Sequence, residues 1–89
     1  MKINNKSQAG SLESSDLIIY LEPADKLRVE VDSSVSPQHG DEIGELIKEE
    51  LKKYKIEKVY IKVQDNGALN LTIRARLKTA LKRGSENGN

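Results

Sequence analysis

Apolar residues recur in this chain first at strand spacing and then at helical spacing. Residues 17–22 are almost continuously apolar, which is typical of a strand covered on both faces. Residues 27–32 alternate between apolar and charged side chains, which is typical of a strand with one buried face. Residues 23–26 include a proline and an aspartate and favour a turn. We therefore predict an antiparallel hairpin here.

An amphipathic helix is predicted after a polar linker at residues 33–40. Asp41 favours a helix start, and the charges that follow it run from acidic to basic, which complements the helix dipole. The apolar residues of this segment recur at helical spacing and form one stripe, made of Ile43, Leu46, Ile47, Leu51 and Tyr54.

The last third of the chain repeats the alternating pattern at residues 58–64 and then turns at residues 65–67, where Asn-Gly favours a hairpin. We predict a fourth strand at residues 69–73 and a helix from Arg74 onward. An alternative remains open, because Leu69, Ile73, Leu77 and Leu81 are four residues apart and would allow a helix that begins near Ala68. The strand is preferred because the turn follows a regular alternating run.

The predicted fold is a small α+β domain with the order ββαββα, in which a four-stranded sheet carries two helices on one face. Residues 1–16 are polar and aperiodic, and we expect them to form a flexible N-terminal arm. Residues 17–83 form the single domain, and residues 84–89 form a disordered tail. The strand order is left open.

Composition excludes several classes of protein. The 89 residues suffice for one domain, and the absence of cysteine excludes disulfides and thiol chemistry of the chain's own. Fifteen basic and fourteen acidic residues nearly cancel, which argues against nucleic acid as the main partner. Lys2 is not followed by a signal-peptide core, and no apolar run approaches the length of a membrane span. We therefore expect a cytoplasmic protein.

Catalytic and metal-binding patterns are missing from the sequence. The single histidine, His39, lies in the predicted linker without a recognisable nucleophile, and we interpret it as solvated. No histidine or cysteine cluster suggests zinc, and isolated glycines do not form a phosphate-binding loop. The pattern predicts a non-catalytic module on which other proteins act.

Four serines, Ser7, Ser11, Ser14 and Ser15, lie within nine residues just before the first apolar run. Such a segment could present a hydroxyl to another protein, or it could be an ordinary solvated arm. Arg74 and Arg76 could bind phosphates or a partner's carboxylates, or they could be a solvated helix edge. Because positive charge near a helix start opposes the dipole, alanine at either position is predicted to keep or slightly raise stability.

Residues 10–16, Gly-Ser-Leu-Glu-Ser-Ser-Asp, resemble the modification-site segment of the citrate lyase acyl carrier protein family, the gamma subunit of that enzyme. The resemblance spans nearly the whole chain in the same order. The departures are His39, where an aromatic residue is expected, and a short tail. The other matching segments are residues 1–4, residues 33–35 followed by Gln38, Gly40 and Asp41, residue 65 with residues 67–69, and residues 73–77.

This resemblance implies that Ser14 carries a phosphoribosyl-dephospho-coenzyme A group through a phosphodiester, attached by a prosthetic-group transferase. It implies that the thiol of this group holds acetyl and citryl thioesters and moves between the citrate lyase alpha subunit, a transferase, and the beta subunit, the lyase. Arg74 and Arg76 match the family pattern without an assigned role. Ordinary acyl carriers are helical bundles, which the alternating strands here do not fit. The alternatives are the acyl carrier subunit of malonate decarboxylase and an unmodified interaction domain.

Overall fold

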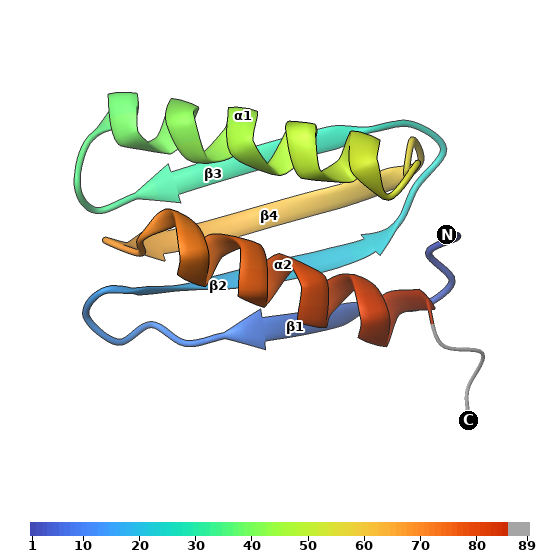
Figure 1. Ribbon diagram of the computed structural model, residues 1–89, viewed down its shortest axis with the longest axis horizontal. Coiled ribbons are helices and arrows are strands. Elements are labelled where there is room, and N and C mark those ends of the chain that lie inside the picture. The colour runs from blue at the N-terminus through green and yellow to red at the C-terminus, as the bar shows by residue number, and fades with distance from the viewer. Residues whose placement is uncertain (86–89) are drawn as a thin grey trace.

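The computed structural model describes residues 1–85, and its strands and helices follow the order βββαβα (Figure 1). The elements are β1 (Ser7–Gly10), β2 (Asp16–Pro23), β3 (Arg28–Ser33), α1 (Pro37–Lys53), β4 (Val59–Asn66) and α2 (Asn70–Ser85).

The four strands form one mixed sheet with the spatial order β1-β2-β4-β3. β1 pairs with β2 and β2 with β4 in antiparallel fashion, whereas β3 and β4 are parallel. Both helices lie over the same face of the sheet (Figure 1). The predicted α+β class, with a four-stranded sheet and two helices on one face, is confirmed.

The predicted hairpin of the first two apolar segments is wrong as a pairing, although both strands exist. β4 lies between β2 and β3 and hydrogen-bonds to each of them. Val59, Ile61 and Val63 of β4 are completely buried, which suits a strand in the interior of the sheet. The chain therefore passes from β2 to the far edge of the sheet before α1 returns it to the centre.

The predicted strand at residues 69–73 is also wrong, because from Asn70 these residues belong to α2. The Asp65 side chain accepts hydrogen bonds from the backbone N–H groups of Gly67 and Ala68, and this turn leads into a helix instead of a hairpin. Ile73, Leu77 and Leu81 are each 1% exposed, so the spacing of four reflects one buried helical face.

The fourth strand comes from the segment predicted to be a flexible arm. Ser7–Gly10 forms β1 at the edge of the sheet, and Ala9 is buried opposite Ile19. Gly84 and Ser85, predicted to lie in the tail, belong to α2, and the carbonyl of Gly84 accepts hydrogen bonds from the N–H groups of Asn4 and Asn5. The domain thus extends beyond residues 17–83 at both ends, and the rest of the predicted tail, residues 86–89, lies outside the described residues.

Helix α1 begins four residues earlier than predicted. Pro37 takes its first position, and Ser36, in an extended conformation, accepts a hydrogen bond from the His39 N–H at 3.0 Å. A hydroxyl cap followed by proline is a favoured helix start, and the sequence interpretation overlooked it. His39 therefore lies in the first turn of the helix and not in a linker.

The core fills the space between the helices and one face of the sheet. Within residues 1–85, no helix is long and apolar enough to cross a membrane. The largest completely buried side chains are Leu17, Ile19, Ile43, Ile47, Leu51, Val59, Ile61, Val63, Ile73, Leu77 and Leu81.

Candidate attachment site

Three connections meet at one end of the sheet, on the left of Figure 1: residues 11–15 between β1 and β2, residues 34–36 between β3 and α1, and residues 67–69 between β4 and α2. The strand register brings these connections together, because Asp16 pairs with Asn66 and Ser33 pairs with Asp65. Ser14 lies in the first of these connections.

Ser14 lies in a turn that backbone hydrogen bonds hold in place. The N–H of Asp16 donates to the Glu13 carbonyl at 3.2 Å, so Ser14 and Ser15 occupy the centre of a four-residue turn. The N–H of Ser15 donates to the Asn66 carbonyl at 2.8 Å and ties the turn to the end of β4. Ser15 has a φ of 63°, in the left-handed region. The segment is thus a defined loop that presents Ser14 at its tip.

The four serines differ in how their hydroxyls are used. Ser7 Oγ donates to the Ala80 carbonyl at 2.6 Å, and Ser11 Oγ donates to Asp16 Oδ2 at 2.6 Å. The side chains of Ser14 and Ser15 are exposed, and their hydroxyls form no hydrogen bond with any residue from 1 to 85. Only these two hydroxyls are therefore available without breaking a contact of the fold.

Arg76 of α2 holds the residue that follows this turn. Its guanidinium donates to Asp16 through Nε at 3.1 Å and through a terminal nitrogen at 2.8 Å. The pKa of the Asp16 carboxyl falls from 3.8 to about 2, chiefly because of the Arg76 hydrogen bonds and against the effect of burial; Ser11 and the Leu17 N–H lower it further. The same contact raises the pKa of Arg76. Asp16 is 8% exposed whereas the Arg76 side chain is 43% exposed, so the carboxylate is largely shielded from water and the guanidinium is not.

Arg74 lies apart from Arg76 and faces helix α1. Its Nε is 3.8 Å from Glu50 Oε1, and Lys53 contacts the same carboxylate at 2.8 Å. The pKa of Glu50 is lowered, first by the Lys53 hydrogen bond and to a lesser degree by the charge of Arg74. Both arginines lie inside α2, which begins at Asn70, so neither is at a helix start. The structure joins Arg76 to the Ser14 turn through Asp16, and it does not bring Arg74 and Arg76 together.

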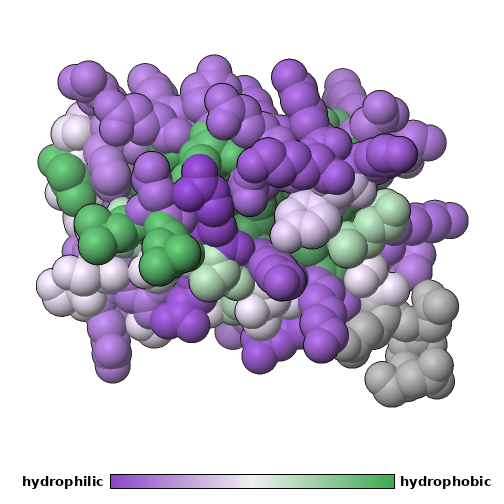
Figure 2. Space-filling model, viewed as in Figure 1, coloured by the Kyte–Doolittle hydropathy of each residue, from purple (hydrophilic) through white to green (hydrophobic). Residues whose placement is uncertain are grey.

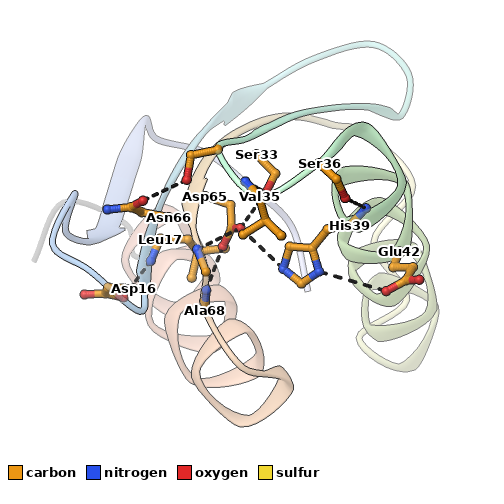
Figure 3. Close-up of polar contacts among 12 residues, drawn as sticks. Asp16, Leu17, Ser33, Val35, Ser36, His39, Glu42, Asp65, Asn66 and Ala68 are labelled. Atoms are coloured by element: carbon orange, nitrogen blue, oxygen red, sulfur yellow. Dashed lines mark hydrogen bonds and ion pairs between the residues drawn. The ribbon is translucent and has the colours of Figure 1, made fainter.

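A second polar cluster, which the sequence interpretation missed, surrounds Asp65 (Figure 3). The completely buried Asp65 carboxylate accepts hydrogen bonds from Ser33 Oγ at 2.8 Å and from the N–H groups of Gly67 and Ala68 at 3.0 Å each. These bonds fix the connection between β4 and α2. The Asp-x-Gly sequence was the available signal, but it was interpreted only as a hairpin turn.

His39 lies beside this cluster and is not the solvated residue that was predicted. Its side chain is 26% exposed, and its Nε2 atom is 3.4 Å from Asp65 Oδ2 (Figure 3). The direction of this approach does not meet hydrogen-bond geometry, and the buried Nε2 has no hydrogen-bond partner among residues 1–85. The contact is therefore a close approach of the two side chains without a formed hydrogen bond.

Asn66 connects the two clusters. Its Nδ2 donates to the Leu12 carbonyl at 3.2 Å, and its Oδ1 accepts from Ser34 Oγ at 2.7 Å. The loop that bears Ser14 is thereby joined to the connection that precedes α1. The described residues contain no group of three or more histidine, cysteine or acidic side chains that could hold a metal ion.

Comparison with known proteins places this arrangement in a family. A family model described as malonate decarboxylase delta subunit matches residues 4–84. Citrate lyase acyl carrier proteins are similar over nearly their whole length. That of Halothermothrix orenii is 38% identical over 97% of this chain and 93% of its own, and that of Haemophilus influenzae strain PittEE is 41% identical over 97% and 90%. The chain belongs to the citrate lyase acyl carrier protein family.

One further relative and one solved structure are also similar to this chain. The citrate lyase acyl carrier protein of Treponema denticola is 34% identical over 97% of this chain and 99% of its own. A chain in the crystal structure of a Pseudomonas malonate decarboxylase hetero-tetramer in complex with malonate superposes with a TM-score of 0.77. It is 23% identical, with 90% of this chain and 84% of that chain covered, and it shows that the two share a fold.

Proposed function

We propose that this chain is the non-catalytic acyl carrier subunit of citrate lyase, and that Ser14 carries a covalently attached phosphoribosyl-dephospho-coenzyme A group. The observation that carries the proposal is the exposed Ser14 hydroxyl, which has no hydrogen-bond partner among the described residues and lies at the tip of a hydrogen-bonded turn. Membership of the citrate lyase acyl carrier family supports the same assignment.

The position of Ser14 suits covalent attachment. Its hydroxyl oxygen would become one ester oxygen of the phosphodiester, and its proton would leave with the group displaced from phosphorus. Exposure of the turn allows a transferase to reach this oxygen, and the backbone bonds to Glu13 and Asn66 limit the movement of the loop. Modification of Ser11 would instead remove the hydrogen bond that its hydroxyl donates to Asp16.

The carrier function follows from tethering. The bound group supplies a thiol on which acetyl and citryl thioesters are held between the transferase (alpha) and lyase (beta) subunits. The folded domain keeps the thioester attached to the complex, so that each delivery occurs at the high effective concentration of a tethered reactant. A cytoplasmic location is part of this proposal.

Arg74 and Arg76 have different roles in the proposal. Arg74 is 46% exposed and only 3.8 Å from one carboxylate oxygen, which leaves it able to contact a phosphate or a partner. Arg76 already binds both oxygens of Asp16, so we assign it to the loop and not to the phosphates of the prosthetic group.

The acyl carrier subunit of malonate decarboxylase is the second candidate. The description of the matching family model and the shared fold of the Pseudomonas chain favour it. The acyl group on protein purified from its own host separates the two if it is citryl, which is expected only for citrate lyase, or malonyl, which is expected only for malonate decarboxylase; an acetyl group fits both. Copurification with citrate-cleaving or malonate-decarboxylating activity gives an independent answer.

The decisive test is the intact mass of the chain and its serine variants, produced in the native host. Wild type and Ser15→Ala should carry the mass of the prosthetic group, and Ser14→Ala should carry none while keeping the wild-type melting temperature. Ser11→Ala is the control for a structural serine, and it should be loaded but less stable. A persistent mass shift in Ser14→Ala would place the group elsewhere. An unmodified wild-type chain would leave the interaction domain as the better description.

A further inference from the structure

Four exposed apolar side chains lie at the end of the molecule that presents Ser14. They come from the three connections and the first turn of α2, and Figure 2 shows hydrophobic side chains gathered at the left end of this view. We call these four residues the apolar rim: Leu12 (61% exposed), Val35 (59%), Leu69 (74%) and Leu71 (79%).

Contacts between the connections show that Leu12 and Val35 of the apolar rim border the Ser14 turn, and Leu69 and Leu71 follow Gly67 at the same end of the sheet. A methyl group placed on Gly67 would lie 3.8 Å from Val35 Cγ2 and 4.0 Å from Ser15 Cα, so Val35 and the turn flank the same glycine. The Leu12 carbonyl accepts a hydrogen bond from Asn66, the residue before that glycine. Large apolar side chains gathered beside a functional residue mark a contact surface better than isolated ones do.

Helix α2 extends from the apolar rim, and all of its charged side chains are positive. Five of the fifteen basic residues of the chain lie in α2, and none of the fourteen acidic residues does. Arg74, Lys78 and Lys82 are exposed and four residues apart, so they form a stripe along one side of the helix. Lys78 and Lys82 form no ion pair with any residue from 1 to 85. We call these three residues the basic stripe.

We propose that the apolar rim and the basic stripe together form the docking surface for an enzyme subunit, whose complementary surface is apolar at the entrance to its active site and acidic beside it. This inference rests on the proposed carrier function, because it assigns the surface around Ser14 to the proteins that use the thioester. The four large apolar residues favour a protein as the partner, because binding to a nucleic acid backbone depends mainly on positive charge and does not require apolar side chains. Because the charged residues of α2 are all basic, we expect the surface of the partner that contacts α2 to be acidic.

The test measures the affinity of the full-length, unloaded chain for the purified alpha and beta subunits of the same host, by isothermal titration calorimetry. The variants are Leu69→Ser with Leu71→Ser for the rim, and Lys78→Glu with Lys82→Glu for the stripe. The matched controls are Leu27→Ser and Lys26→Glu in the turn at the opposite end of the sheet, where Leu27 is 39% exposed. All six side chains are exposed, so the fold should be kept, and the melting temperature verifies this.

We expect each double variant to raise the Kd for at least one subunit tenfold or more, and each control to change it less than twofold. The effect of the charge reversal should shrink as salt increases, whereas the effect of the rim variant should not. Wild-type affinity in both double variants would overturn the docking surface. Binding of the wild-type chain to anionic vesicles or duplex DNA, without binding to either subunit, would overturn it as well.

Intact mass of the same variants from the native host separates this inference from the proposed function. If the wild-type chain is loaded and both double variants bind the subunits with unchanged affinity, the carrier function is supported and the docking surface is refuted. An unloaded wild-type chain whose subunit affinity still falls in the double variants supports the docking surface and removes the carrier function.

Discussion

Arg76 binds both carboxylate oxygens of Asp16 and thereby fastens the start of β2 to helix α2, directly after the turn that presents Ser14. Ser11 donates to the same carboxylate from the other end of the loop. Two residues of the loop region, Ser11 and Asp16, thus form one polar cluster with Arg76, which lies 60 residues beyond Asp16, and this cluster limits where Ser14 can move. The Arg76 guanidinium, which the sequence suggested as a phosphate ligand, binds Asp16 and so holds the loop in place.

Substitution of Arg76 should therefore lower stability, contrary to the expectation from helix dipoles. Arg76→Ala leaves the 8% exposed Asp16 without its main partner, and we expect a loss of about 1–2 kcal/mol in the free energy of unfolding, because the half-exposed guanidinium is partly screened by water. Urea denaturation measures the loss. Arg74→Ala, which removes one 3.8 Å contact, is the matched control and should cost less than about 0.5 kcal/mol. Equal losses in the two variants would refute the distinction.

The same pair predicts how stability depends on pH. The pKa of Asp16 is about 2 in the folded chain against an ordinary 3.8, so below pH 4 the unfolded chain binds more protons than the folded one at this position. The stabilisation from ionised Asp16 is complete above about pH 4 and is lost as the pH falls toward 2. Thermal unfolding of wild type and Asp16→Asn from pH 6 to pH 2 measures this. The difference in melting temperature should be largest at pH 6 and nearly vanish at pH 2; a constant difference would exclude this origin.

Local patterns in the sequence identified most of the elements but not their pairing. The strands around Ile19, Val29 and Ile61 followed from apolar spacing, which depends only on which face is buried. The insertion of β4 between β2 and β3 depends on contacts between residues 32 to 50 positions apart, and periodicity does not encode these. The strand Ser7–Gly10 was missed because it is a four-residue edge strand with one buried apolar side chain.

The surroundings of the candidate site could not be predicted from local patterns either. Ser14 came from the resemblance of residues 10–16 to the modification-site segment of the family. The partners of that loop, Arg76 and Asn66, lie 62 and 52 residues further along the chain, and only the folded sheet brings them to it. Arg76 was chosen by family pattern, but its role required the position of Asp16. His39 was misplaced because the Ser-Pro helix start was not recognised.

Ser15 provides a test of the turn that is independent of modification. Its φ of 63° is unfavourable for a residue with a Cβ atom, and glycine adopts it without steric cost. Ser15→Gly should therefore leave stability unchanged or raise it by up to about 1 kcal/mol, even though glycine adds entropy to the unfolded chain. Ser14→Gly, at a position without positive φ, gains no such relief and should lose about 0.5–1 kcal/mol. Chemical denaturation of both variants decides, and a larger loss in Ser15→Gly would mean that the turn has another conformation.

Two glycines should respond to the same substitution with opposite signs. Gly10 ends β1 with a φ of +105°, and a Cβ atom there would lie 1.9 Å from the Leu17 carbonyl oxygen, which accepts the Ser11 N–H. Gly10→Ala must therefore displace the backbone that leads into the Ser14 turn, and we expect a loss of more than about 2 kcal/mol in the free energy of unfolding.

Gly44 lies within α1, where a Cβ atom would meet Val31 Cγ2 at 3.8 Å, an ordinary contact. Gly44→Ala should raise stability by about 0.5–1 kcal/mol, because alanine is the better helix former. Thermal and urea unfolding of the two variants give the signs directly. If Gly10→Ala is tolerated, the strand Ser7–Gly10 does not join the turn as described, and the fixed presentation of Ser14 would have to be abandoned.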